Sequence, residues 1–180
     1  MRLIKKILFC YLIVFFLTLI IQSCCHDRFR IIGNGEIGAY TDYYNPGNKI
    51  DTVKGAFLIN WNLELKTTSL INNISLFQSC YATGCAQTFE NEIVDSSFTI
   101  SCNKDFKYNG LLIAAETDFS DLDKIVIYIE KKWGGVEIQF SKDFLDLTDF
   151  DKCDYEFKVN IKTTDNIYFE NKLKVNMDLK

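Results

Sequence analysis

The sequence has little of what most enzymes use for proton transfer at neutral pH. A single histidine, His26, occurs among its 180 residues. Histidine is the side chain whose ordinary pKa lies closest to neutrality, so this leaves Ser-His-Asp and Cys-His catalysis without a base in the rest of the chain. No glycine-rich phosphate loop and no nucleophile motif is present. These absences exclude the commonest hydrolase designs, and we expect no enzymatic activity.

Clusters of basic residues are also missing. The chain has 20 lysines and arginines against 24 acidic residues, a net charge of −4. Three of the basic residues lie within the first 23 positions, so the remainder carries about −7. Proteins that bind nucleic acids draw much of their affinity from lysine and arginine side chains that neutralise phosphates. Nucleic acid is therefore excluded as a partner.

Aspartates are the remaining candidates for chemistry, and they occur in two groups. They could supply the carboxylate pair of a glycosidase, which lies about 5–9 Å apart across a cleft, or oxygen ligands for calcium. The Asp-x-Asp-x-Asp-Gly spacing of calcium loops and the Cys-x₂-Cys pairs of zinc sites are absent. We interpret both groups as solvated loops that end strands, with no metal and no cofactor; a small carboxylate-dependent hydrolase is the alternative. The groups are Asp118, Asp121 and Asp123, and Asp143, Asp146, Asp149, Asp151 and Asp154.

The sequence does have a long hydrophobic run near its N-terminus. Residues 1–6 carry three positive side chains, and residues 7–21 form a 15-residue apolar run that only Cys10, Tyr11 and Thr18 interrupt. This is the anatomy of an export signal peptide. An uncleaved membrane-spanning helix is the alternative, although such a helix needs about 20 apolar residues.

The run ends in Ile21-Gln22-Ser23-Cys24, which resembles the lipobox of bacterial lipoproteins. The resemblance implies that the signal is removed before Cys24, whose thiol carries diacylglycerol and whose amine takes a further acyl chain such as palmitate. Two or three chains give stable membrane anchoring. No aspartate follows Cys24 directly, so the resemblance also implies the outer membrane, with either face open. Cys25 fits the pattern less well, since it would put Gln22 at position −3.

Export divides the chain into a signal peptide at 1–23, a lipid anchor and tether at 24–50, and a domain at 51–180. The tether is expected because glycines recur between residues 33 and 38 and the only proline is Pro46. Tyr40, Tyr43 and Tyr44 beside this proline could form a platform for a sugar ring or a partner chain. Packing of the segment against the first strand explains these tyrosines as well.

Apolar residues beyond position 50 recur with period two, which predicts strands. Residues 57–65 and 153–161 show this alternation, and it resumes at 167–179 after a polar turn. Shorter strands are expected at 92–94, 97–102 and 111–115, whereas 70–78 is ambiguous. Seven or eight strands without a convincing helix predict an all-β fold. We expect a single antiparallel β-sandwich, immunoglobulin-like in the broad sense, with a small β-barrel as the alternative.

The pair Gly134-Gly135 predicts a hairpin, because glycine supplies the backbone freedom that a two-residue turn needs. Each resulting cross-strand pair would be favourable. The expected pairs are Trp133 with Val136, Lys132 with Glu137 and Ile129 with Phe140.

Four of the seven cysteines fall in the domain, and export would place them where disulfides persist. Cys80 and Cys85 bracket a four-residue, turn-like loop. Cys102 and Cys153 share the apolar faces of their strands, and a bridge between them would close about 50 residues and contribute roughly 4 kcal/mol. We predict Cys80–Cys85 and Cys102–Cys153 bridges; free buried cysteines are the alternative.

The stretch from Phe98 to Phe106, a strand running into a polar turn and an aromatic residue, is similar to a stretch in small outer-membrane lipoprotein families of unknown function. This resemblance implies no activity. We therefore expect a non-catalytic binding or accessory module that meets the membrane through its lipid anchor and takes a glycan or an envelope protein as its partner. A purely structural envelope component is a further alternative.

Overall fold

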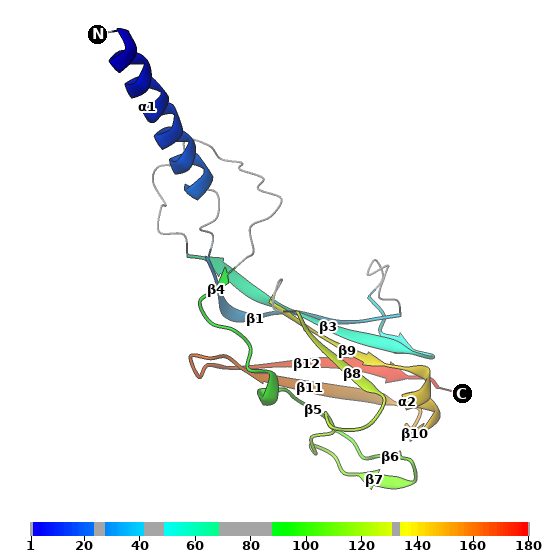
Figure 1. Cartoon of the computed structure of the whole chain (residues 1–180). Helices are drawn as coiled ribbons and strands as arrows, with labels where there is room; N and C mark the ends of the chain where they lie inside the picture. Colours follow the sequence, from blue (N-terminus) through cyan, green and yellow to red (C-terminus); the bar gives the residue numbers. More distant parts are fainter. Residues whose placement is uncertain (1, 24–27, 42–48, 69–87, 131–133, 180) are drawn as a thin grey trace. The chain divides into compact units, whose positions relative to one another are not determined.

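The structure is a computed structural model that describes residues 2–23, 28–41, 49–68, 88–130 and 134–179 (Figure 1). The chain divides into two compact units, Met1–Arg30 with Lys66–Glu90 and Ile31–Leu65 with Asn91–Lys180. Its elements are α1 (Arg2–Ser23), β1 (Arg28–Tyr40), β2 (Thr52–Val53), β3 (Phe57–Thr67), β4 (Thr88–Phe89), the 3-10 helix η1 (Asp95–Ser97), β5 (Thr99–Cys102), β6 (Phe106–Tyr108), β7 (Leu111–Ile113), β8 (Ile125–Glu130), β9 (Gly135–Phe140), α2 (Lys142–Asp146), β10 (Thr148–Asp149), β11 (Asp154–Lys162) and β12 (Tyr168–Met177).

The first unit contains α1 and a short pair of strands. Residues 2–23 have no glycine or proline to interrupt a helix, and the described side chains from 6 to 16 are all exposed. Within the described residues, no helix has the length and apolar character needed to cross a membrane. Strand β4 pairs in parallel with the start of β1, where the rings of Phe29 and Phe89 lie 6.0 Å apart.

The second unit is an all-β sandwich, which confirms the predicted fold class. Within this unit one sheet has the strand order β1-β3-β9-β8 and the other β2-β12-β11-β5, and Figure 1 shows the two layers. Aromatic side chains fill the space between them. The Phe57 ring of β3 stacks on Phe140 of β9 at 4.5 Å, and Phe157 of β11 lies 5.7 Å from Phe140. The pairing is antiparallel except at the two-residue strands β2 and β4.

The predicted C-terminal hairpin is confirmed as β11 and β12, which pair over nine residues. Alternate β11 side chains are buried, among them Tyr155, Val159 and Ile161. Charged pairs cross the opposite face: Lys174 Nζ lies 2.7 Å from Asp154, Lys172 Nζ 3.2 Å from Glu156, and Lys158 Nζ 3.3 Å from Glu170. The alternation predicted for 57–65 is confirmed in β3, whose Ile59 and Trp61 are fully buried.

Residues 28–40 belong to β1 and do not form part of a tether as expected. The glycines that favoured a turn allow close approach between strands instead. Gly35 has a φ of +57°, and a Cβ there would lie 1.9 Å from the Asn62 carbonyl oxygen of β3. The indole Nε1 of Trp61 donates to the carbonyl of Asn34 beside it. Glycine inside a strand is typical of such a close approach.

The hairpin of β8 and β9 forms in a different register from the predicted one. Ile129 pairs with Val136 and Ile125 with Phe140, a shift of four residues, while Trp133 and Lys132 lie outside the described residues. Because side chains alternate with period two, an even shift keeps every side chain on its expected face. Gly134 does not close a two-residue turn; its carbonyl accepts a hydrogen bond from Leu63 of β3 at 3.0 Å.

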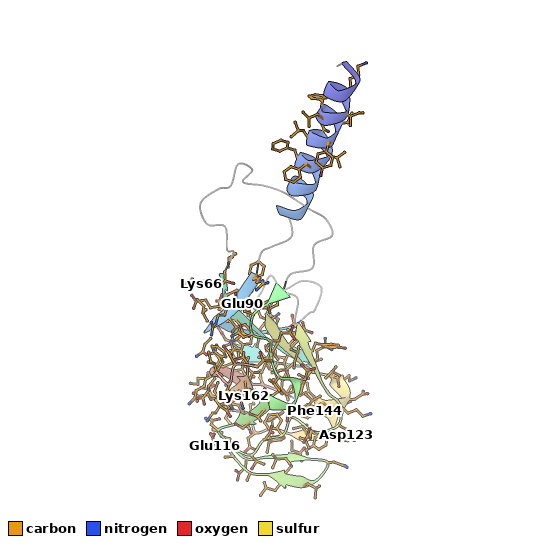
Figure 2. The ribbon with its side chains drawn as sticks, turned by 60° about the vertical axis from the view of Figure 1, so that its left-hand side comes forward. Lys66, Glu90, Glu116, Asp123, Phe144 and Lys162 are labelled. Carbon is orange, nitrogen blue, oxygen red and sulfur yellow. The ribbon has the colours of Figure 1, made fainter. Side chains whose placement is uncertain are left out.

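A third, smaller sheet has the order β10-β6-β7 and includes a hairpin at Asn109-Gly110, where both residues have positive φ. Beside it the short helix α2, which the sequence analysis did not expect, is capped by Ser141, whose hydroxyl accepts from Phe144 N at 3.2 Å. Phe144, labelled in Figure 2, is fully buried and stacks on Tyr108. The described residues contain twelve strands, more than expected, because those of two or three residues are too short to show a period.

Candidate binding site at the β8 edge

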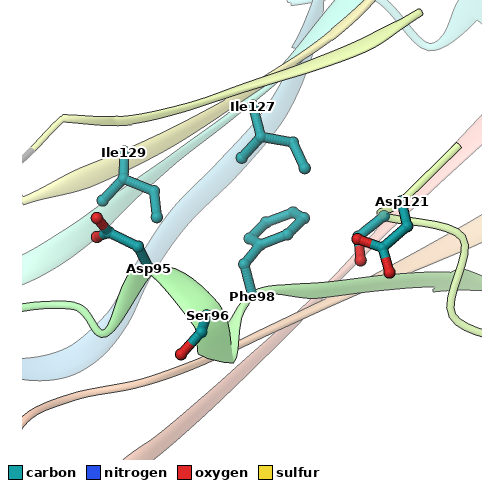
Figure 3. Close-up of a pocket in the computed structure, with 7 residues that line it drawn as sticks. Asp95, Ser96, Phe98, Asp121, Ile127 and Ile129 are labelled. Carbon is teal, nitrogen blue, oxygen red and sulfur yellow. The ribbon is translucent and has the colours of Figure 1, made fainter. Parts of the chain in front are cut away.

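A pocket of about 380 Å³ opens between the edge of one sheet and the segment that leads into β5 on the other (Figure 3). We call it the seam pocket, because it lies where the two layers of the sandwich meet at their edges. It is lined by Asp95 and Ser96 of η1, Phe98, Ser120, Asp121, and Ile127 and Ile129 of β8.

The floor of the seam pocket is apolar and incompletely covered. Ile127 and Ile129 are half-buried, whereas their β9 partners on the same face, Ile138 and Val136, are 0% and 1% exposed. Phe98 is 7% exposed and comes from the opposite layer, and Figure 3 shows its ring directed towards Ile127. One strand away from the edge the same face is closed, so the exposure of the two isoleucines results from their edge position.

The rim of the pocket is polar, and its two charged groups are carboxylates. Asp118 holds the turn that presents Ser120 and Asp121, since its Oδ1 accepts from Ser120 N at 3.0 Å. On the other side, the Ser97 hydroxyl fixes η1 by donating to the Val94 carbonyl at 2.6 Å and accepting from Lys162 N at 2.8 Å. The lining residues include no lysine, arginine or histidine. The pocket therefore combines an apolar floor with an acidic rim.

The β5 edge is covered by the chain that follows it. Phe119 N donates to the Ile100 carbonyl at 2.9 Å, and Glu116 N donates to the Cys102 carbonyl at 2.8 Å. Asp118 Oδ1 accepts from Ile100 N at 3.0 Å, so its carboxylate takes the place of a neighbouring strand. These contacts satisfy both outward backbone groups of Ile100 and the carbonyl of Cys102 without a further strand.

The outer edge of β8 is different. Among the described residues β8 pairs with β9 alone and ends its sheet. Its sequence, Ile-Val-Ile-Tyr-Ile-Glu, contains none of the lysine or proline residues with which proteins commonly blunt an edge strand. On the face away from the core, Val126 is 39% exposed and Tyr128 49% exposed. An apolar edge strand of this kind is a site for pairing with another strand.

Most of the site residues predicted from sequence fall elsewhere. Cys24, Cys80, Cys85, Tyr43 and Tyr44 lie outside the described residues.

Tyr40 is described, and it is half-buried at the end of β1, where it bridges to Lys49. A Cβ on Gly38 would lie 2.9 Å from its hydroxyl, so the phenol ring lies against that glycine. This contact lies within β1 itself, and the binding role expected for Tyr40 stays a prediction.

The predicted Cys102–Cys153 bridge is not formed, and both thiols are free in the structure. The strand register agrees with this: Cys102 lies opposite Phe157, whereas Cys153 comes four residues earlier, just before β11 begins. Four extended residues span roughly 13 Å, more than the Cα–Cα separation of a disulfide. Cys102 Sγ donates to the Lys104 carbonyl at 3.1 Å, and Lys104 Nζ lies 3.2 Å from Cys153 Sγ. Burial raises the pKa of the Cys102 thiol to about 11.

In the two groups of aspartates predicted from sequence, Asp118 and Asp154 make hydrogen bonds or ion pairs that hold neighbouring backbone or side chains in place. Asp118 fixes the β5 edge, and Asp154 pairs with Lys174 and accepts from Asn176 at 2.8 Å, contacts that lower the pKa of the Asp154 carboxyl. Burial also raises the pKa of the neighbouring Tyr155 phenol to about 12, and its hydroxyl accepts from Asp151 N. Within the described residues, no group of three or more histidine, cysteine, aspartate or glutamate side chains could hold a metal ion.

No protein-family model and no curated protein matches the chain. Among solved structures, the chain resembles the C-terminal domain of the Streptococcus pyogenes antigen I/II-family protein AspA, with 12% identity, a TM-score of 0.30, and coverage of 81% of this chain and 46% of that one. A structure described as BspA_C_mut has 10% identity, a TM-score of 0.28, and coverage of 78% and 46%. The chain thus spans less than half the length of either, and the architecture described above rests on the chain's own strand pairing.

The seam pocket was missed by the sequence analysis. Of the β8 residues, the sequence analysis named only Ile129, as part of a hairpin, and no local pattern indicates which strand ends a sheet. The run of apolar residues on both faces of β8, with no edge-blunting residue, was the one available signal.

Proposed function

We propose that this protein is an exported, lipid-anchored envelope protein that works by binding a protein partner, and that the seam pocket with the β8 edge is its binding surface. The observation that carries the proposal is the incomplete closure of the sandwich at β8. Elsewhere on the same face, core side chains such as Ile138 are fully buried, and at β8 the isoleucines are half-exposed beside a backbone edge with which no further strand of the described residues pairs.

A protein partner fits this surface better than a glycan. Sugar rings are recognised by exposed aromatic faces. Phe98, the aromatic residue that lines the seam pocket, is 7% exposed, and the exposed Tyr128 of β8 lies on the face of the strand away from the pocket. Aliphatic side chains and free backbone groups are suited to another polypeptide. The described Tyr40 also packs against its own chain, although Tyr43 and Tyr44 stay candidates from sequence.

Anchoring rests on the N-terminal residues. The cationic start, the apolar run and Ile21-Gln22-Ser23-Cys24 support it, as does the absence of any polar face among the described side chains of 7–16. A helix that is apolar on all sides is typical of a segment buried in a protein core or inserted into a membrane, and not of one that lies on a protein surface. Replacement Cys24→Ala should release the protein from membranes and remove the acyl mass from the mature chain, while Cys25→Ala should change neither. A lipidated Cys24→Ala protein would reject the anchor site.

The binding surface can be tested with the full-length protein in its own membrane. A photo-crosslinking amino acid at Tyr128, on the β8 edge, should give a discrete crosslinked protein species. The matched control places the same group at Leu111, which is 70% exposed on the β6–β7 hairpin and should give none. Equal crosslinking at both positions would contradict a specific surface, and loss of a reproducible turnover on Asp121→Asn would favour the hydrolase alternative instead.

A further inference from the structure

We propose, on the basis of that function, that the partner enters as an extended segment that adds to β8 as a further strand, with every second, aliphatic side chain in the seam pocket and basic residues at its ends, beside the acidic rim. The partner is thus defined by chemistry: an extended aliphatic segment flanked by cationic residues.

The backbone of β8 supplies the first argument. In an antiparallel pair, alternate residues exchange hydrogen bonds with the neighbouring strand and the others direct their N–H and C=O groups away from it. The six residues of β8 are paired on one side by β9, so the outward groups of this strand face away from the sheet. A strand of six residues is about 20 Å long, which is enough for a peptide of similar length. Pairing of this kind gives affinity through main-chain hydrogen bonds.

The side chains of the seam pocket supply the second argument. A strand added to β8 continues the face that carries Ile127 and Ile129, and every second side chain of the added strand would project towards Phe98. At about 380 Å³ the pocket suits a few aliphatic side chains and not a folded domain. Their burial would complete the core at the edge where it is open.

Charge supplies the third argument and separates a foreign partner from a second copy. Of the two carboxylates in the lining, Asp95 and Asp121, the exposed Asp121 carries this argument, and the chain has a net charge of −4. A basic segment would be attracted to this rim. A second copy would bring its own carboxylates to the same edge, and juxtaposed like charges disfavour a partner.

The test uses the full-length protein in detergent and a fluorescent, end-capped peptide of alternating valine and threonine with two lysines at each end. Its controls are the same peptide N-methylated on alternate residues, which removes the hydrogen-bonding groups of one edge, and a version with glutamate in place of lysine. We expect each control to bind about tenfold more weakly or worse. Equal binding of the N-methylated peptide would overturn strand addition, and equal binding of the glutamate peptide would overturn the charge argument.

Three variants locate the site. Ile127→Lys places a charge on the inner face of the edge strand and should abolish peptide binding, whereas Ile167→Lys, at a residue 40% exposed in the β11–β12 turn, should leave it unchanged. Asp121→Asn should weaken binding about threefold to tenfold and reduce its salt dependence. A chain that dimerises through β8, with dimerisation lost in Ile127→Lys, would overturn the proposal in favour of a second copy. A further outcome is that a protein partner crosslinks at Tyr128 and is displaced by the N-methylated peptide as well as by the unmethylated one. That result would leave the proposed function standing and would reject only the addition of a strand to β8.

Discussion

The two strands that flank the seam pocket differ in how their outer edges are closed. β5 is covered by residues 114–120, whose amides and the Asp118 carboxylate occupy its outward backbone groups. β8 has no comparable cover among the described residues and has no charged or proline residue to discourage pairing before Glu130. Both strands belong to one sandwich and share its core. An open edge at β8 is therefore a local property of that strand and not of the fold.

The largest expected effect is the loss of stability when a buried isoleucine of β9, one strand in from the open edge, is truncated. Ile138 and Ile127 are cross-strand partners on the same face, but Ile138 is 0% exposed and Ile127 is half-buried. Ile138→Ala should lower the free energy of unfolding by about 2–5 kcal/mol, because it leaves a cavity in a closed core, and Ile127→Ala should cost about 1 kcal/mol. Urea denaturation of both variants measures the difference. Equal losses would show that the edge is as well packed as the centre.

The next effect concerns Cys102 of β5, the strand whose edge is covered, and is measured as the rate at which its thiol is alkylated. Burial raises the pKa of Cys102 to about 11, so at pH 8 its thiolate fraction should be about 100-fold below that of an ordinary cysteine. Iodoacetamide should therefore modify Cys102 about 100-fold more slowly in the folded than in the unfolded protein. Because the folded pKa is raised, the unfolded chain loses its proton first, and stability should fall as the pH rises from about 9 towards 11. The variant Cys102→Ser should lose less of its free energy of unfolding over this pH range, because the titrating thiol is absent.

A smaller effect is expected from a substitution that uncovers the β5 edge. Asp118→Ala removes the acceptor of the Ile100 and Ser120 amides, and we expect a loss of about 1–2 kcal/mol with faster hydrogen exchange at Ile100. The adjacent rim carboxylate offers a matched control, since Asp121→Ala should stay within about 0.5 kcal/mol of the parent. Similar losses from the two aspartates would mean that Asp118 does not hold the β5 edge.

The sequence carried enough information for the strands with long, unbroken alternation and too little for features set by distant contacts. β11 and β12 were predictable because a short polar turn joins two runs of period two. The glycines of β1 were misinterpreted as turn residues. Gly35 is needed because its backbone closely approaches that of Asn62, which lies 27 residues further along the chain.

The registers and edges show the same limit. The faces of β8 and β9 were predicted and their register was not, since an even shift leaves the faces unchanged. The pairing of Cys102 with Phe157, which separates the two thiols, likewise depends on which strands adjoin. The seam pocket could not be predicted because it exists only once β8 ends one sheet and β5 ends the other.

Hydrogen exchange of the two edges in the full-length protein, with and without the lysine-flanked valine and threonine peptide, tests the central claim most directly. The amides of 125–130 should include a fast-exchanging set in the free protein and become protected when the peptide is added, while those of 99–102 should be slow in both states. Protection that is already complete at 125–130 before the peptide is added, or peptide binding that leaves these amides unprotected, would contradict the account of β8 as an open edge that receives a strand.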